Sequence, residues 1–382
     1  MANVLSNLAA DIYKAADMVG RELVGVIPSI TVNGDATTRA AKGDTIRSFA
    51  TRAVTVNSSF APSMTIPEGT DQTVDNKTMT VDTYASVQIP WTGEDMKHVN
   101  NGSGFETIYG DQIKQAMRAI TNTIESAVWT TARAGASRAT GTAGTTPFAS
   151  NHDSLADLRK MLADNGCPMD GAVTLAMNTS AGAALRKLTQ LQKANEAGGT
   201  ELLRQGTLLD LQGIMIKESA APVSVTAGTG ASYTTNTAGY AVGATAITLI
   251  TGTGTILAGD VVTFAGDSNK YVVATALTGG VLTLAEPGLK VAIGASATAV
   301  TVGSAATANV CFHQGAIELG IRAPAQPGGG DAAVDMMTVQ DPFSGLVFEI
   351  AAYKGYMKSM FDVRCLYGTK AWNSKFIMQL LG

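Results

Sequence analysis

The sequence predicts an α+β fold into which a small antiparallel β-barrel is inserted, and three patterns lead to this prediction. Apolar residues from Phe105 onward recur at helical spacing for roughly 27 residues. Alternating stretches near the C-terminus are typical of paired strands. Between Ser219 and Ile317 charged residues become rare, and Thr, Val, Ala and Gly dominate. A chain of 382 residues is long enough for two or three packed units.

An amphipathic helix is predicted at the N-terminus. Apolar side chains from Leu5 to Leu23 recur three and four residues apart, which predicts a helix of roughly five to six turns. Asp11, Asp17 and Glu22 fall largely outside this apolar stripe. The segment lacks the basic start and the apolar run of a secretory signal, so export is not expected.

An extended β-hairpin is predicted between Asp44 and Ile89. β-Branched stretches at Thr45–Phe49 and Val81–Ile89 indicate its two strands. The excursion between them is long and polar and contains Pro and Gly, so it cannot bury much surface against its own domain. We therefore expect the hairpin to pack on a surface outside its own domain.

A long helix and an α+β region follow. The long helix begins after the breaker Gly102-Ser103-Gly104 and extends from Phe105 to Arg133, on the order of 40 Å. A second helix is predicted at Leu155–Asn165, with Ser154 as its N-cap and Gly166 as its C′ residue. Next come a buried strand at Val173–Met177 and a helix capped by Thr179 or Ser180 with an apolar face of Leu185, Leu188 and Leu191.

The low-charge module is predicted to be a small closed β-barrel, because short strands recur about every ten residues between turns that contain Gly or Asp. The predicted strands are Ala246–Ile250, Val261–Phe264, Tyr271–Ala274 and Val281–Leu284. Phe264 is expected in the barrel core. Two alternating stretches after the module, Leu346–Ala352 and Met357–Leu366, predict a C-terminal β-hairpin. Its basic residues, Arg364 among them, are interpreted as a solvated strand face, and nucleic-acid contact is the less favoured alternative.

Composition and motifs argue against catalysis and against a cofactor or metal site. The formal net charge of −4 lacks the basic field of a dedicated nucleic-acid reader. The three imidazoles, His98, His152 and His313, have no metal-ligand spacing, and the three cysteines are interpreted as buried thiols. Ser150-Asn151-His152-Asp153 contains the residue types of a catalytic triad, but a turn and helix cap is the preferred interpretation.

The order of these elements resembles the major capsid proteins of tailed bacteriophages, which share the Hong Kong 97 fold. The hairpin 44–89 resembles the extended loop of that family, and the helix 105–133 resembles its spine helix. The inserted module narrows the resemblance to coat proteins similar to that of the Salmonella podovirus P-twenty-two. Two local segments support this resemblance. Leu257–Gly266 resembles a strand pair of the barrel in those coat proteins, and Val363–Gly368 resembles the family's C-terminal segment.

The resemblance implies a division of the chain into six parts. These are an N-terminal arm helix (1–41), an extended β-hairpin loop (42–90), a peripheral domain with the spine helix (91–140), an axial domain (141–218), a β-barrel insertion domain (219–309) and a return through the axial and peripheral domains (310–382).

The resemblance also implies a function and partners. The chain is expected to self-assemble as hexamers and pentamers into the icosahedral head of a virion, formed in the host bacterial cytoplasm around double-stranded DNA bound without sequence specificity. A portal protein is an expected partner. A separate scaffolding protein is also expected, because no scaffold is fused to the arm. A decoration protein is a further candidate, and no membrane partner is expected. Candidate subunit contacts are Phe60, Glu68, Asp71 and Lys77; candidate scaffold contacts are Asp11, Asp17 and Glu22, for which a solvated helix face is an equal alternative.

Two alternatives from other classes are open. The chain could be a phage surface or tail protein whose β-module binds a host glycan through Tyr233, Tyr240, Phe264 and Tyr271. It could also be a hydrolase that uses His152, in which case activity would depend on that side chain.

Overall fold

The computed structural model describes residues 23–51, 62, 64–66, 74–99, 105–193, 210–340 and 346–382. Most of the N-terminal helical pattern and six candidate contacts lie outside these residues. The six are Asp11, Asp17, Glu22, Phe60, Glu68 and Asp71.

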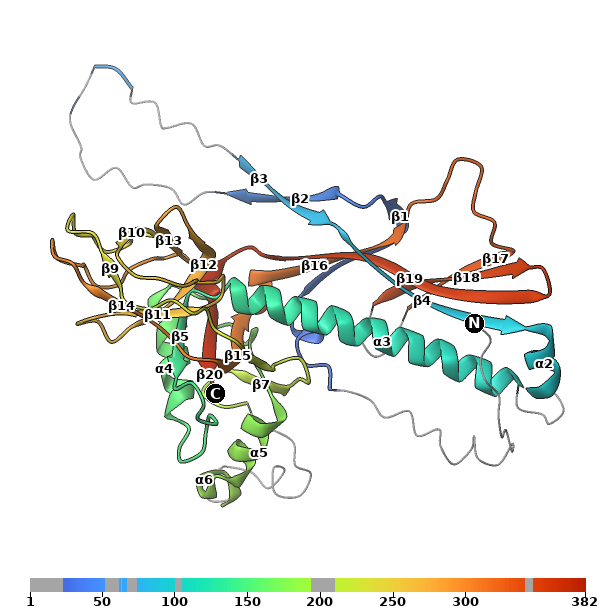
Figure 1. Ribbon diagram of the computed structural model, residues 1–382, viewed down its shortest axis with the longest axis horizontal. Coiled ribbons are helices and arrows are strands. Elements are labelled where there is room, and N and C mark those ends of the chain that lie inside the picture. The colour runs from blue at the N-terminus through green and yellow to red at the C-terminus, as the bar shows by residue number, and fades with distance from the viewer. Residues whose placement is uncertain are drawn as a thin grey trace.

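A six-stranded sheet and one long helix form the elongated part of the molecule (Figure 1). The sheet has the order β1-β16-β19-β18-β17, and β4 pairs with β19 as well. Only the β1–β16 pair is parallel. The bounds are β1 (Thr31–Ala40), β16 (Ile317–Pro324), β19 (Lys358–Ala371), β18 (Val347–Gly355), β17 (Asp335–Gln340) and β4 (Thr83–Thr92), which is followed by the short helix α2 (Gly93–Val99).

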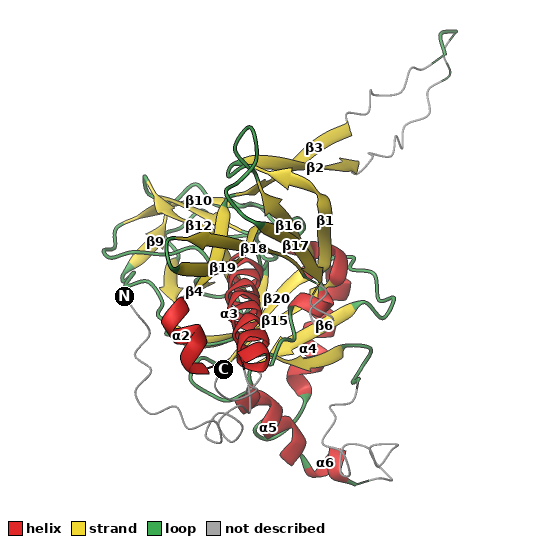
Figure 2. Ribbon diagram, turned by 90° about the vertical axis from the view of Figure 1, so that its right-hand side faces the viewer, coloured by secondary structure: helices red, strands yellow, loops and turns green. Residues whose placement is uncertain are grey.

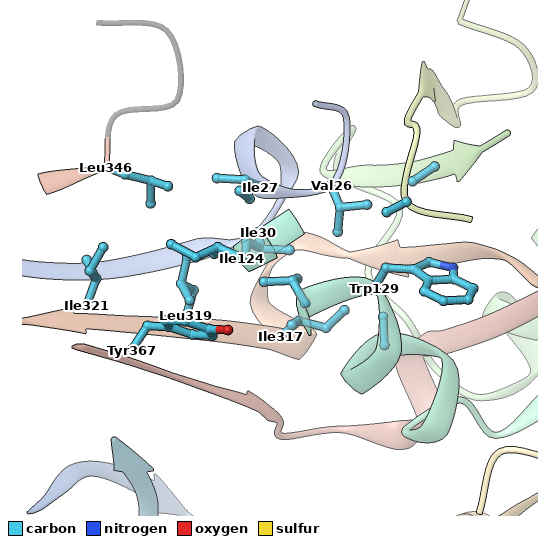
Figure 3. Close-up of a cluster of buried hydrophobic side chains, with 14 of the residues drawn as sticks. Val26, Ile27, Ile30, Ile124, Trp129, Ile317, Leu319, Ile321, Leu346 and Tyr367 are labelled. Carbon is cyan, nitrogen blue, oxygen red and sulfur yellow. The ribbon is translucent and has the colours of Figure 1, made fainter. Parts of the chain in front are cut away.

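The long helix α3 (Phe105–Ala134) confirms the predicted spine helix. Its side chains at three- and four-residue spacing, from Ala116 through Ile124 to Ala132, are buried. They pack into the main hydrophobic core together with the short helix η1 (Ile27–Ser29) and strands β16 and β19 (Figure 3). Trp129 also donates a hydrogen bond from Nε1 to the Ala308 carbonyl at 2.8 Å.

A second, larger sheet begins in the α+β region and continues into the inserted module. Its body strands are β5 (Arg138–Gly141), β20 (Ile377–Leu381), β15 (Ala306–His313), β6 (Val173–Met177), β7 (Met215–Glu218) and β8 (Ser224–Val225). The helices α4 (Asp153–Asp164), α5 (Thr179–Lys187) and α6 (Thr189–Gln192) belong to the same region. The predicted apolar face of Leu185, Leu188 and Leu191 is buried, although the chain breaks at Leu188 into two helices.

The helix ends show where local sequence rules hold. Gly166 has the expected left-handed conformation after α4, and the N–H groups of Gly166 and Cys167 bond back to Ala163 and Leu162. The expected N-caps are wrong. Helix α4 already includes Ser154, because it begins at Asp153. Helix α5 is capped by Asn178, whose side chain accepts from the Ala181 N–H at 2.9 Å.

The inserted module is a closed six-stranded antiparallel barrel, as predicted. Its strands follow the order β11-β14-β9-β10-β13-β12, and β12 closes the ring by pairing with β11. The bounds are β9 (Tyr233–Thr235), β10 (Ala246–Ile250), β11 (Val261–Phe264), β12 (Lys270–Thr278), β13 (Val281–Leu284) and β14 (Ala299–Val302). Phe264 is 2% exposed in the core and contacts Tyr271 edge to face, with ring centroids 5.7 Å apart.

The predicted hairpin differs in its second strand. Strand β2 (Asp44–Thr51) pairs with β3 (Val74–Val81), whereas the predicted strand Val81–Ile89 lies almost entirely in β4 of the six-stranded sheet. Only Asp82 separates β3 from β4, so the chain passes from one sheet to the other without a turn that the sequence would signal. Strand β1 was not predicted; the C-terminal hairpin is confirmed as β18–β19.

Candidate functional site

The two-stranded ribbon β2–β3 is the first candidate surface for contact with another chain. Among the described strands, β2 and β3 pair only with each other, and the ribbon leads away from both larger sheets (Figure 2). Its foot is fixed by close packing. A Cβ at Gly368 of β19 would lie 2.2 Å from the Thr80 carbonyl oxygen, and a Cβ at Gly320 of β16 would lie 2.6 Å from Met79. Both glycines therefore let the ribbon foot approach the body.

Lys77 is the one candidate subunit contact within the described residues. Its ammonium donates a hydrogen bond to the Trp372 carbonyl at 3.3 Å and lies 6.0 Å from the centre of that ring. The indole Nε1 of Trp372 in turn donates to Glu318 Oε2 at 2.6 Å. Lys77 is exposed, so it contacts its own chain and also remains open to a neighbour.

A buried ionic cluster stabilises the middle of the six-stranded sheet. Arg364 on β19 bonds through Nε to Glu349 Oε1 at 2.8 Å and through Nη2 to Asp331 Oδ2 at 3.1 Å. Arg39 of β1 pairs with the other oxygen of Glu349 at 2.5 Å. The expectation that Arg364 belongs to a solvated basic face is therefore wrong, because Arg364 is 9% exposed and bonds to carboxylates on β18 and on the loop before β17.

The charges in this cluster do not balance. Asp362 is 4% exposed, and its Oδ2 is 3.7 Å from Arg364, while Oδ1 has no hydrogen-bond partner. Burial raises the pKa of Asp362, although the nearby Arg364 opposes the rise. The hydrogen bonds from Tyr353 and Arg364 instead lower the pKa of Asp331. The cluster thus contains two carboxylates that pair closely with arginine, Glu349 and Asp331, and a third, Asp362, that does not.

Large apolar side chains are exposed at the far end of the six-stranded sheet. Tyr356 and Met357 form the two-residue tip between β18 and β19 and are 93% and 69% exposed. Met336 and Met337 are exposed on β17, which ends the sheet on that side. Large apolar side chains exposed at a sheet edge and at a hairpin tip are candidate contacts for another chain.

The barrel is joined to the body by strand pairing. Strand β12 of the barrel pairs with β5, with Lys270 opposite Ala139 and Tyr271 opposite Arg138. Next to this junction, Gln379 Nε2 donates to the Arg133 carbonyl at 2.7 Å, at the end of α3. A cavity of about 40 Å³ between Arg133, Asp260 and Gln379 is large enough for about one water molecule. The module is therefore continuous with the sheet of the body.

The residues proposed for other functions have structural roles in the barrel and at a helix end. Phe264 and Tyr271 lie in the barrel core, and the Tyr240 hydroxyl accepts from the Thr248 N–H at 2.8 Å. This arrangement removes two of the four aromatics from a glycan-binding surface. His152 occupies the N-cap position of α4, but its side chain makes no capping hydrogen bond. The Asn151 side chain accepts from the Asp153 N–H at 3.4 Å, so the segment is a turn at the start of the helix.

The described part of the chain has neither a metal-binding cluster nor a membrane-spanning helix. Within it, no three His, Cys, Asp or Glu side chains gather in a way that could hold a metal ion. None of the helices found there combines the length and apolar character needed to cross a membrane.

Comparison with known proteins identifies the fold. No protein-family model matches the chain, and no curated protein matches it in sequence. A chain of Mycobacterium phage Che8 is similar in structure, with a TM-score of 0.51 and 12% identity over 100% of this chain and 98% of that one. A chain from the capsid structure of the cyanophage P-SCSP1u gives a TM-score of 0.53 at 12% identity, over 100% and 92% of the two chains. The mixed α/β fold is therefore that of Hong Kong 97-like capsid subunits.

Sequence patterns alone did not identify Glu125 or the carboxylates around Arg364. Glu125 lies beside Ile124 on α3 and is buried, so an acid next to the apolar stripe of the helix was the only available signal. Asp331 and Glu349 are 33 and 15 residues from Arg364, which no local motif connects.

Proposed function

We propose that this chain is the major capsid protein of a tailed bacteriophage, which assembles as hexamers and pentamers into an icosahedral head around double-stranded DNA. The observation that carries the proposal is the similarity of fold, over the whole chain, to a chain of a cyanophage capsid. The proposed role is structural and not enzymatic. The proposed location is the shell of the virion, after assembly in the host bacterial cytoplasm.

The exposed surfaces support self-association. A two-stranded ribbon is at best marginally stable alone in water, so β2–β3 gains most by packing on a neighbouring copy. Phe60, Glu68, Asp71 and Lys77 are the proposed contacts there. Large permanent interfaces also accommodate apolar groups such as Tyr356 and Met337.

The closed barrel supports a finer proposal, a coat protein of the P-twenty-two-like type. Its six strands are inserted between β8 and β15, which are themselves paired. We propose the same division of the chain as above, with the insertion domain at 219–309. A separate scaffolding protein bound through Asp11, Asp17 and Glu22, a portal protein and a decoration protein remain proposed partners.

Electron microscopy tests the proposal. The chain would be purified alone and after co-expression with its neighbouring phage genes, and both samples would be examined by negative stain. Closed uniform shells in either sample are the expected result, and their appearance only after co-expression would indicate a scaffold. Persistent monomers in both samples would contradict the proposal.

A further inference from the structure

We infer that Glu125 couples two parts of the chain that are far apart in sequence. One is the N-terminal strap, residues 23–30, which leads into β1. The other is the insertion root, residues 218–221, where the chain leaves β7 for the barrel. Because the same buried carboxylate binds both, the strap docks stably only on a chain in which the insertion root has formed.

The strap is bound through its main chain. The N–H groups of Gly25 and Val26 donate to Glu125 Oε1 at 2.8 and 2.7 Å, and the Ile27 N–H donates to Oε2 at 2.9 Å. Val26 and Ile27 are fully buried beside α3 (Figure 3). Three consecutive amides that surround one carboxylate fix both the position and the direction of the strap.

The insertion root binds the same oxygen. The Ser219 hydroxyl donates to Glu125 Oε1 at 2.7 Å, while the Ser219 N–H donates to the Met177 carbonyl at 2.9 Å. Ser219 is fully buried. Its hydroxyl therefore reaches Glu125 only when the end of β7 is paired with the end of β6.

The strap and the root also touch directly. The Ala220 N–H donates to the Leu23 carbonyl at 3.0 Å. A Cβ at Gly25 would lie 2.4 Å from the Glu218 carbonyl oxygen. The Glu218 carboxylate is held in place by two bonds of 2.6 Å from Arg186, so the root presents a fixed surface to the strap.

Coupling follows from the burial of the charge. Glu125 is 2% exposed, and its four hydrogen bonds all come from neutral groups. A buried carboxylate that loses donors is strongly destabilised, because no water replaces them. Loss of the root bond therefore weakens the site that holds the strap, and loss of the strap removes three of the four donors. In an assembled shell, the coupling would control how the residues before the strap meet a neighbouring subunit. This consequence rests on the proposed function.

Hydrogen exchange on the purified subunit tests the coupling. Ser219→Ala removes one donor that touches none of the strap amides. We expect amide exchange at Gly25, Val26 and Ile27 to rise about tenfold or more in this variant, since bonds to charged groups are the strong ones. Unchanged exchange at these three amides would show that strap and root are independent and would overturn the inference.

Two further variants approach the coupling from the other side. Glu125→Gln, with exposed Glu94→Gln as its control, is expected to raise exchange in the strap and at Ala220 together. In Gly25→Ala the new methyl group overlaps the insertion root and displaces the strap. Gly34→Ala is the matched control, because a Cβ at Gly34 lies at an ordinary 3.5 Å from Ile321. We expect the Ala220 amide to exchange faster in Gly25→Ala but not in Gly34→Ala. Equal exchange rates at Ala220 in the two variants would contradict the coupling.

These experiments separate the inference from the proposed function. Exchange is measured on the unassembled subunit, and shell formation of the unchanged chain is measured by microscopy. Coupled exchange without shells would sustain the inference and remove the proposed function, and shells with uncoupled exchange would do the reverse.

Discussion

The barrel and the β2–β3 ribbon bury their residues in opposite ways. The barrel pairs every strand on both sides and encloses its own apolar core around Phe264 and Tyr271. The ribbon pairs on one side of each strand only, and its buried side chains, such as Met79 and Val81, lie at the foot, against the body. The barrel is therefore stable from within, whereas the ribbon depends on what lies beneath it.

The largest expected effect tests the barrel. Phe264→Ala should lower the free energy of unfolding by about 3 to 5 kcal/mol, because it leaves a cavity in a closed core. Denaturant unfolding of the purified subunit measures the change. The control Thr248→Ala alters an exposed side chain of β10 and should stay within about 0.5 kcal/mol. An unchanged melting temperature for Phe264→Ala would contradict its assignment to the core.

The next largest effect tests the ribbon foot. Gly368→Ala places a methyl group 2.2 Å from the Thr80 carbonyl oxygen and should destabilise the subunit by about 1 to 3 kcal/mol, the typical effect of overpacking. Hydrogen exchange in β3 should rise as well. At Gly355 a Cβ would lie 3.6 Å from the nearest atom, so Gly355→Ala is the matched control. Equal stability of the two variants would show that the foot is not tightly packed.

A smaller effect concerns the sheet to which the ribbon is connected. Burial raises the pKa of Asp362, so its folded form retains the proton better than its unfolded form. Above the raised pKa the buried and poorly compensated charge of Asp362 destabilises the sheet. The subunit should therefore lose stability as pH rises through the window between the ordinary pKa and the raised one. Asp362→Asn should therefore stabilise the subunit on the order of 1 kcal/mol near pH 8, an ordinary size for a single substitution.

Melting curves of Asp362→Asn and the unchanged chain from pH 4 to pH 8 measure this effect. The difference should shrink toward pH 4, because the folded form of Asp362 takes up its proton before the pH reaches the ordinary pKa of an aspartate. Asp331→Asn is the contrasting variant. Its pKa is lowered by Tyr353 and Arg364, so its loss should destabilise the subunit near pH 8. Stabilisation by both variants would contradict the assignment of the poorly compensated charge to Asp362.

The smallest expected effect separates contacts within the subunit from contacts between subunits. Lys77 is exposed, and its hydrogen bond and ring contact with Trp372 should contribute at most about 0.5 to 1 kcal/mol to the stability of the subunit. Lys77→Ala should therefore melt nearly like the unchanged chain. If Lys77 also contacts a neighbour, assembled shells should dissociate at lower denaturant concentration. Shells of unchanged resistance would remove Lys77 from the proposed subunit contacts.

The contrast between the barrel and the ribbon also explains what the sequence could predict. Three of the four predicted barrel strands have the predicted bounds, because each alternates between core and surface and ends at a Gly or Asp turn. The spine helix was likewise evident from its apolar spacing. In both elements the information is local.

The failures concern interactions between distant segments. The chain passes from β3 into β4 at Asp82, beside Gly320 and Gly368, which lie more than 230 residues downstream and make room for the foot of the ribbon. The donors to Glu125 come from residues 25–27 and from Ser219, and the partners of Arg364 come from β18 and a loop. No spacing rule connects such residues, since they meet only after the sheets have formed. All seven candidate contacts remain predictions: Asp11, Asp17, Glu22, Phe60, Glu68, Asp71 and Lys77.

The direct passage from β3 into β4 has a mechanical consequence. Strand β4 pairs with β19 in unbroken antiparallel register from Thr83–Tyr367 to Thr92–Lys358. Hydrogen bonds between antiparallel strands run across the strand direction. A pull on the ribbon along β4 therefore loads this whole register in shear instead of opening it one bond at a time. Tension applied to the ribbon is distributed along β19, which carries it to β16 and β18 on either half of its length.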